Sequence, residues 1–330
     1  MSEKFFITMP DNAKRKRHFP KNLIAELEKL GSVDWNPYER KMTEEELCEL
    51  GGDATILLTH WGSPQVTETY LKRNPDLKLI AHCAGTVAHI ASEATYAAGI
   101  PCLSANSVMA RYVAEAVLGL IISGMRGFKE NDILMQKGVW DKSFPTKSLL
   151  DSTVGLVGLG TIGRNLLDLL APFETKAFIF DPYITDDALV RWPNAELASF
   201  DRVLDCDVVS VHASQTPETY HMINEEAFSK MRDGATFINT SRGSLVDTAA
   251  ARKMIESKHL QAAFDVYETE ECSQDLLIGC DSIVMQPHMS ATPAGAKMTE
   301  EIIKDIERFL NGEKLTLSVS YQQFSYMTQE

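Results

Sequence analysis

Three side chains that could move protons or bind an anion each follow an apolar, strand-like segment. Arg242 lies in "FINTSRGSLVD", Glu270 in "AAFDVYETEE" and His288 in "SIVMQPHMSATP". Taken singly, each has a simpler explanation: a surface arginine, a solvated glutamate and a packed histidine. Because the carboxyl ends of parallel strands meet at one edge of a sheet, we expect the three groups to lie together. An imidazole, a carboxylate and a guanidinium together could perform acid–base chemistry on an anionic substrate.

A glycine motif precedes these residues in "VGLVGLGTIGRNLL", with Gly158, Gly160 and Gly163 between an apolar strand and a helical pattern. The first glycine allows a tight turn, the second lets the backbone approach a pyrophosphate, and the third lets helix and strand pack closely. The next strand-like segment, "KAFIFD", ends in Asp181. A carboxylate there accepts hydrogen bonds from ribose hydroxyls and repels a 2′-phosphate, so the motif predicts NAD as the cofactor.

The elements that must position these residues alternate in period along the chain. Strand-like and helical segments alternate over the first hundred residues, and the alternation restarts at Thr153. Between the two series we expect a long helix over 108–124 and then a polar connection; a last amphipathic helix covers 297–312. The pattern predicts two doubly wound α/β domains, each built on a parallel sheet.

Composition narrows the possible functions. The net charge of −14 argues against nucleic acid as a partner, and we expect the basic run "KRKRH" at 14–18 to be the solvated start of a surface helix. The six cysteines form no CxxC pair, so no metal site is expected. The apolar stretch 112–125 is too short to span a bilayer, and the N-terminus lacks the apolar region of a signal peptide. We therefore expect a cytoplasmic protein that binds no membrane.

The motifs resemble, in this order, those of the D-isomer-specific 2-hydroxyacid dehydrogenase family. They are "VGLVGLGTIG" with Asp181, "NTSRGSLVD", "FDVYETEE" and "PHMSAT", with weaker support from "AHCAGT", "VAEAVLGLI" and "VHASQTPETYHMIN". The resemblance covers nearly the whole chain and is greatest to the phosphoglycerate dehydrogenase and glyoxylate/hydroxypyruvate reductase branches. It implies an NAD-dependent oxidoreductase that interconverts a D-2-hydroxy acid and its 2-oxo acid.

The resemblance also implies roles for individual residues. The family's catalytic arginine, glutamate and acid/base histidine correspond to Arg242, Glu270 and His288. Cofactor contacts are implied at Gly158, Gly160, Thr161, Ile162, Gly163, Asp181, Ala213, Thr240, Arg242, Asp265 and His288. The substrate carboxylate is implied to bind Arg242 and the amides of Ala84, Gly85 and Thr86. Trp61 either lines the substrate pocket or belongs to the core.

In this family the nucleotide domain is inserted into the substrate domain. The resemblance therefore implies a flavodoxin-like substrate domain over 1–104 and 296–330, and a Rossmann NAD-binding domain over 105–295. The long helix after residue 108 contributes to a dimer interface in the family, which implies a homodimer here.

Some positions depart from the family pattern, and two other functions remain open. Glu271 replaces a usual proline after the catalytic glutamate, and Ser214 and Gln215 replace Pro-Leu in the "HxPLT" motif. Formate dehydrogenases share the fold but carry glutamine where Glu270 stands, which argues against that activity. A dehydrogenase-like, NADH-sensing corepressor would keep the same residues, and turnover of 2-oxo acids would distinguish it from an enzyme.

Overall fold

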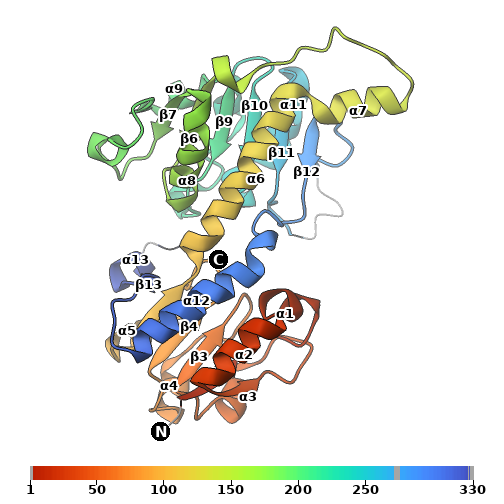
Figure 1. The fold of residues 1–330 in the computed structure, drawn as a ribbon. Helices are drawn as coiled ribbons and strands as arrows, with labels where there is room; N and C mark the ends of the chain where they lie inside the picture. The colour runs from red at the N-terminus through yellow and green to blue at the C-terminus, as the bar shows by residue number, and fades with distance from the viewer. Residues whose placement is uncertain (1–2, 271–275, 326, 328–330) are drawn as a thin grey trace. The chain divides into compact units, whose positions relative to one another are not determined.

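The computed structural model describes residues 3–270, 276–325 and 327, so Glu271 lies outside the described residues. The chain forms two compact units (Figure 1). Unit 1 comprises 1–109 and 292–330, and unit 2 comprises 110–291. The expected domains divided at 104/105 and 295/296, and each unit has its own sheet and core.

Unit 1 is a parallel sheet extended by one antiparallel edge strand. Its strands are β1 Glu3–Ile7, β2 Gly31–Trp35, β3 Ile56–Thr59, β4 Leu79–His82, β5 Cys102–Ser104 and β13 Ser318–Val319. Its helices are α1 Ala13–His18, α2 Lys21–Leu30, α3 Glu44–Leu50, α4 Glu68–Arg73, α5 Glu93–Ala97, α12 Gly295–Leu310 and α13 Tyr321–Ser325. The strand order is β13-β5-β4-β3-β1-β2, which is the flavodoxin-like order with β13 added.

The central strands of unit 1 are buried along their whole length. Every residue of β3 and β4 is buried, because helices cover both faces of the sheet. α12 packs beside α2, while α3, α4 and α5 pack beside one another. The register pairs Thr59 with His82, so the loops after β3 and β4 begin next to each other at the carboxyl edge.

The basic run at 14–18 was expected to be the solvated start of a surface helix, and Lys14, Lys16 and Arg17 are exposed on a short helix. This helix, α1, ends before Pro20, the N-cap residue of α2, and the Arg15 guanidinium turns inward. Arg15 Nη2 donates to the carbonyl oxygens of Met9 at 2.6 Å and Asn36 at 2.5 Å, and His18 is buried. α1 is thereby fixed at the carboxyl ends of β1 and β2.

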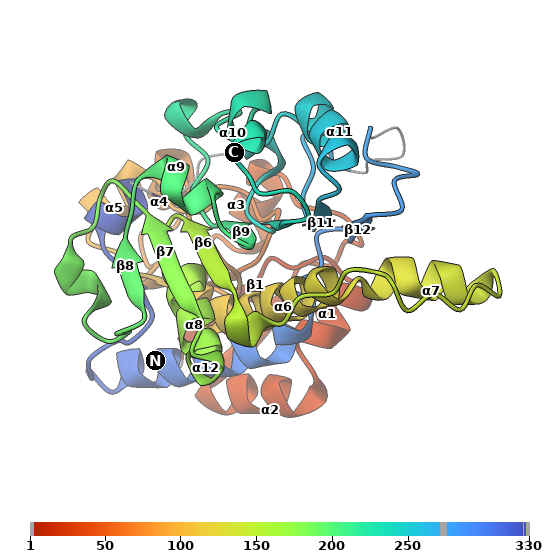
Figure 2. The same cartoon turned by 90° about the horizontal axis from the view of Figure 1, so that it is seen from above.

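Unit 2 is an all-parallel, seven-stranded sheet. Its strands are β6 Thr153–Val157, β7 Lys176–Phe180, β8 Ala195–Leu197, β9 Val208–Val211, β10 Thr236–Asn239, β11 Gln261–Phe264 and β12 Ile283–Met285. Its helices are α6 Asn106–Arg126, which begins in unit 1, α7 Phe128–Gln136, α8 Thr161–Leu170, α9 Phe200–Leu204, α10 Glu225–Ser229 and α11 Thr248–Ser257. The order β12-β11-β10-β9-β6-β7-β8 reverses direction between β6 and β9, which is where doubly wound sheets bind ligands. Figure 2 shows α6 and α8 on one side of this sheet and α10 and α11 on the other.

The long helix α6 packs directly on the sheet of unit 2. A Cβ at Gly124 would lie 2.6 Å from the methyl carbon of Thr236, so only glycine allows this close approach. Within the described residues, α6 is the one helix long and apolar enough to cross a bilayer, which corrects the expectation that this stretch is too short. The core helix of a soluble protein passes the same test, and α6 buries Val113, Val117 and Ile121.

The segment 127–152 was expected only as a polar connection, and its first part forms helix α7. No residue of α7 is buried, and the helix projects away from the sheet of unit 2 (Figures 1 and 2). Sequence periodicity did not detect it, because a helix with no buried residue carries no continuous apolar stripe.

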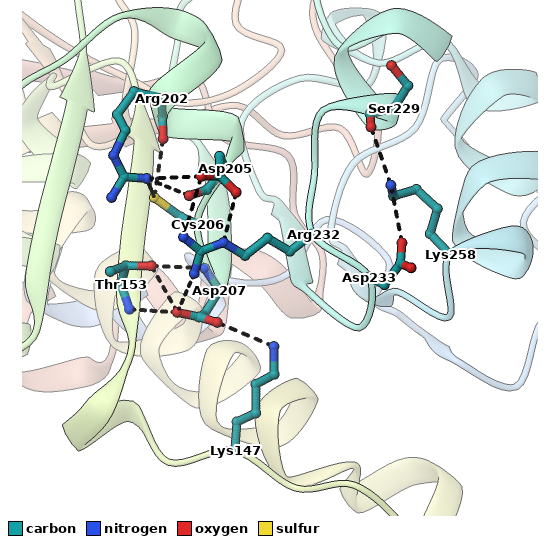
Figure 3. A network of polar contacts seen from close by, with 10 residues as sticks. All are labelled: Lys147, Thr153, Arg202, Asp205, Cys206, Asp207, Ser229, Arg232, Asp233 and Lys258. Atoms are coloured by element: carbon teal, nitrogen blue, oxygen red, sulfur yellow. Dashed lines mark hydrogen bonds and ion pairs between the residues drawn. The ribbon is translucent and has the colours of Figure 1, made fainter.

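A polar network joins the amino ends of the strands in unit 2 (Figure 3). Asp207 accepts hydrogen bonds from the backbone and side chain of Thr153, and it pairs with Arg232 at 3.1 Å and Lys147 at 3.3 Å. Burial raises the pKa of Asp207, but the bonds to Thr153 and the two cations outweigh burial and lower it overall. The network fixes the edge of the sheet opposite the candidate site.

Candidate active site

The glycine turn between β6 and α8 has the shape that a dinucleotide requires. Gly158 has φ +94°, and a Cβ there would lie 2.8 Å from the Ala213 nitrogen. A Cβ at Gly163 would lie 3.1 Å from the Gly158 carbonyl oxygen. At Gly160 a Cβ would meet nothing within 4 Å, so this face of the turn is open. These positions match the three steric roles expected of the motif.

The start of α8 leaves backbone amides free to bind an anion. Gly160 is the N-cap residue and supplies no side-chain hydrogen bond, so the first amides, at Thr161 and Ile162, have no cap. Beside them, the Asp181 carboxylate accepts hydrogen bonds from the amides of Leu159 at 2.8 Å and Tyr183 at 3.0 Å. Asp181 is therefore held in place at the carboxyl end of β7, next to the turn.

Buried polar atoms near the switch point fit the same cofactor. Thr240 is 8 % exposed, and its Oγ1 has no hydrogen-bond partner among the described residues. Its neighbour Ser241 donates from Oγ to the Ala213 carbonyl at 2.6 Å, so the loops after β9 and β10 meet here. An open turn, uncapped amides and an unsatisfied buried hydroxyl are what a bound NAD would complete.

Arg242 lies where β10 leads into a short 3₁₀ turn over Gly243–Leu245. Asn239 Nδ2 donates to the Arg242 carbonyl at 2.9 Å, which shapes the backbone, and Arg242 Nη1 donates to the Ser241 carbonyl at 2.8 Å. A Cβ on Gly243 would lie 1.9 Å from the carbonyl carbon of Tyr267. The glycine after Arg242 is therefore required for this loop to pack against the loop that carries Glu270.

Glu270 and His288 form an ion-pair contact. His288 Nδ1 lies 3.4 Å from Glu270 Oε1, and about half of each side chain is exposed. The pair follows β11 and β12, which are hydrogen-bonded neighbours. Of the two ring nitrogens of His288, Nδ1 is the one in contact with the carboxylate, and Nε2 takes no part in this ion pair. The predicted pairing of a carboxylate with this histidine is thus present.

The backbone at His288 is in the left-handed region, with φ +48°. Asp265, only 1 % exposed, stabilises this turn: its two carboxylate oxygens accept the amides of Met289 at 2.8 Å and Ser290 at 3.0 Å. The His288 amide donates to the Asp265 carbonyl at 2.9 Å. Asp265 was predicted to contact the cofactor; in the structure it holds the histidine turn.

The backbone amides predicted to bind the substrate carboxylate, those of 84–86, lie in unit 1 after β4. Ser104 Oγ donates to the Gly85 carbonyl, and Thr86 Oγ1 accepts the Ala88 amide at 3.2 Å. A Cβ at Gly85 would lie 2.9 Å from the terminal methyl of Met109. The loop that begins at the buried Ala84 is therefore tightly packed, with Thr86 partly exposed.

Trp61 follows β3 and is not a core residue, since 45 % of it is exposed. Its ring packs edge-on against His60, with centroids 4.7 Å apart, and against His18 at 6.3 Å. Sequence reasoning missed these two histidines. His60 Nε2 lies 3.1 Å from His18 Nδ1. The sequence signal for His60 was its position directly before Trp61.

The buried histidines of unit 1 are held neutral. Burial, together with the charges of Arg17 and Lys14, lowers the pKa of His18 to about 4. Burial lowers the pKa of His60 well below its ordinary value and that of His82 to about 3. At neutral pH the two imidazoles that contact Trp61, His18 and His60, are therefore uncharged.

Residues 118–290 match the model for the NAD-binding domain of D-isomer specific 2-hydroxyacid dehydrogenases, and they include the glycine turn, Arg242, Glu270 and His288. A glyoxylate reductase from Thermofilum pendens is 32 % identical over 86 % of this chain and 84 % of its own length. This chain belongs to the D-isomer specific 2-hydroxyacid dehydrogenase family. A D-3-phosphoglycerate dehydrogenase from Mycobacterium leprae is also 32 % identical, over 72 % of this chain and 46 % of its own length. The chain thus spans about half the length of the phosphoglycerate dehydrogenases that it matches.

Solved structures of the same kind share the fold. D-lactate dehydrogenase with NAD⁺ from Lactobacillus jensenii has a TM-score of 0.79, with 21 % identity over 96 % of this chain and 99 % of its own. The family match confirms the predicted family and its NAD cofactor, and the relatives named in the comparisons are dehydrogenases and reductases. The two doubly wound units confirm the predicted fold.

Proposed function

We propose that this family member interconverts a D-2-hydroxy acid and its 2-oxo acid, with His288 as the acid/base group. The observation that carries the proposal is the contact between His288 Nδ1 and Glu270 Oε1 at 3.4 Å. It lies at the carboxyl ends of neighbouring strands of the NAD-binding sheet. Because both side chains are half exposed, a substrate can reach them.

In the proposed reaction, each residue has one task. NAD, when bound, supplies or accepts the hydride at C2 of the substrate. In reduction, protonated His288 donates a proton from Nε2 to the carbonyl oxygen, while the Glu270 carboxylate orients the ring and favours the imidazolium. In oxidation, neutral His288 accepts the hydroxyl proton at the same nitrogen.

Arg242 is the proposed carboxylate ligand. Its planar fork matches two carboxylate oxygens, and its charge stabilises the negative charge that develops on the carbonyl oxygen. We further propose that the amides of 84–86 bind the same carboxylate and that Trp61 contacts the rest of the substrate. Trp61 is exposed and follows β3, and β3 pairs with β4, the strand that precedes 84–86, which supports this proposal.

A substrate panel tests the proposed function. The protein is assayed with NADH and glyoxylate, hydroxypyruvate, pyruvate, branched and aromatic 2-oxo acids, and the product is separated on a chiral column. We expect turnover of at least one acid and a D product. Absence of turnover across the panel, or a predominantly L product, would contradict the proposal.

We also propose a cytoplasmic homodimer. No residue of α7 is buried, and its ends carry Phe128 and Met135, 58 % and 50 % exposed, with Trp140 beyond at 75 %. Exposed apolar side chains gathered on one projecting segment are typical of a protein–protein interface. A second copy of the chain is the partner that family membership favours.

A further inference from the structure

A second histidine–carboxylate pair lies in unit 2, close to the proposed catalytic pair. His221 Nε2 is 2.6 Å from Glu268 Oε1, which is shorter than the 3.4 Å contact between His288 and Glu270. About a third of each side chain is exposed. The roles proposed above for Arg242, Glu270 and His288 do not use this pair.

Glu268 connects three segments at the carboxyl edge of the sheet. Its Oε2 accepts the amide of Thr248, at the start of α11, at 3.3 Å, while Oε1 binds His221, in the loop after β9. The His221 amide donates to the Ser244 carbonyl at 2.8 Å. The loop with His221, the loop after Arg242 and the loop with Glu268 are therefore held to one another.

Glu268 lies close to Glu270 along the chain, and its backbone packs against the residue that follows Arg242. Glu268 precedes Glu270 by two residues. A Cβ on Gly243, the residue after Arg242, would lie 2.3 Å from the Glu268 nitrogen. A shift of Glu268 would thus move the backbone on which Glu270 lies and against which the Arg242 loop packs.

Several interactions hold His221 and Glu268 in their contact. Partial burial raises the pKa of Glu268, but hydrogen bonds from Thr248 and His221 outweigh it and lower the pKa overall, so Glu268 stays a carboxylate. The His221 ring stacks on Tyr220, with centroids 4.0 Å apart and planes 14° from parallel. His221 itself has φ +49°, a conformation that its neighbours must hold in place.

We propose that His221 and Glu268 are positioning residues that hold Glu270 within reach of His288. This inference rests on the proposed function, since it assigns the pair a task in setting the protonation of the catalytic histidine. Neither residue contacts substrate or cofactor; both act through Glu270. A pair that only stabilised the fold would change the unfolding temperature but not the pH dependence of turnover.

The test compares His221→Ala, Glu268→Gln and the conservative His221→Gln, whose amide nitrogen can still donate to Glu268. For each variant, kcat/KM for reduction is measured across pH, NADH affinity by fluorescence titration, and unfolding temperature by calorimetry. For His221→Ala and Glu268→Gln we expect kcat to fall about tenfold, which is 1.4 kcal/mol, and the alkaline limb to move to lower pH. NADH affinity should stay within about twofold, and His221→Gln should restore the original limb.

Lys253→Ala provides a matched control. It removes a 2.5 Å ion pair with Glu225 from the same unit without touching the 265–270 loop. The control should leave the pH profile unchanged. If His221→Ala lowers stability or kcat while the alkaline limb stays where it was, the pair is only structural and the inference is wrong.

A double variant separates this inference from the proposed function. In a Glu270→Gln background, His221→Ala should move the limb no further, because its effect passes through Glu270. An additional, independent shift would overturn the positioning role while leaving the proposed function intact. If Glu270→Gln alone moves no limb, the proposed function itself fails.

Discussion

At Arg242 the effect of the planar guanidinium can be tested separately from the effect of its positive charge. Lysine keeps the positive charge but loses the planar fork that matches a carboxylate. We expect Arg242→Lys to raise KM, lower kcat and reduce kcat/KM by about tenfold or more. Steady-state kinetics on the best substrate of the panel measure both constants. Kinetics equal to those of the unmodified protein would mean that Arg242 only shapes its loop.

Asp181 sets the preference between the two nicotinamide cofactors. Two amides fix its carboxylate beside the glycine turn, where it would repel a 2′-phosphate. We expect kcat/KM to be at least about tenfold higher with NADH than with NADPH, for which 1.4 kcal/mol suffices. Equal efficiency with both cofactors would show that Asp181 does not face the ribose.

At the scale of elements, the sequence predicted those that repeat a clear period. The strands and helices around the glycine turn and the triad were placed correctly because apolar alternation and end signals agree there. The basic run forms a surface helix, as expected, but its charges gave no sign that Arg15 binds carbonyl groups after two strand ends. α7 was missed because none of its residues is buried, so it shows no apolar stripe.

The candidate site shows the same limit. Arg242, Glu270 and His288 could be recognised because each follows a strand, and strand ends converge in a parallel sheet. His221 and Glu268 could not be paired from sequence, since they are 47 residues apart and meet only through loop packing. The role of Asp265 in the His288 turn likewise depends on two backbone amides that no motif specifies.

His82, the buried and neutral last residue of β4, predicts that the stability of unit 1 falls at acid pH. Burial lowers the pKa of His82 to about 3, whereas a free imidazole in the unfolded chain titrates near about 6.5. The contribution of neutral His82 to the free energy of unfolding is therefore complete above about pH 6.5. It is lost as the pH falls toward 3, by about 1.4 kcal/mol per pH unit.

His82→Asn should flatten this dependence, because the side chain no longer binds a proton on unfolding while its amide can still bond to Thr59. Urea unfolding at several pH values between 4.5 and 7 measures the slope. The exposed His259, replaced by Asn as a control, should leave the slope unchanged. An unchanged slope for His82→Asn would show that the buried imidazole is not the group being titrated.

At the scale of the whole molecule, α7 is the proposed point of assembly. Placing a charge at an apolar contact removes buried area and adds desolvation cost, so Phe128→Glu should convert a dimer to a monomer. Val190→Glu, at an apolar side chain 81 % exposed in the same unit, is the control and should stay dimeric. Light scattering after gel filtration measures both masses. A monomeric unmodified protein, or a Phe128→Glu dimer, would contradict the role of α7.

The central claim is that His288 exchanges the proton and that Glu270 favours its charged form. Glu270→Gln keeps the size of the side chain but removes the negative charge 3.4 Å from Nδ1. Reduction needs the imidazolium, so the alkaline limb of its kcat/KM profile should move to lower pH, and the acidic limb for oxidation should move the same way. The decisive measurement is this pair of pH–rate profiles for the unmodified protein and Glu270→Gln. A parallel shift of both limbs is the predicted result, and two unmoved limbs would contradict the account.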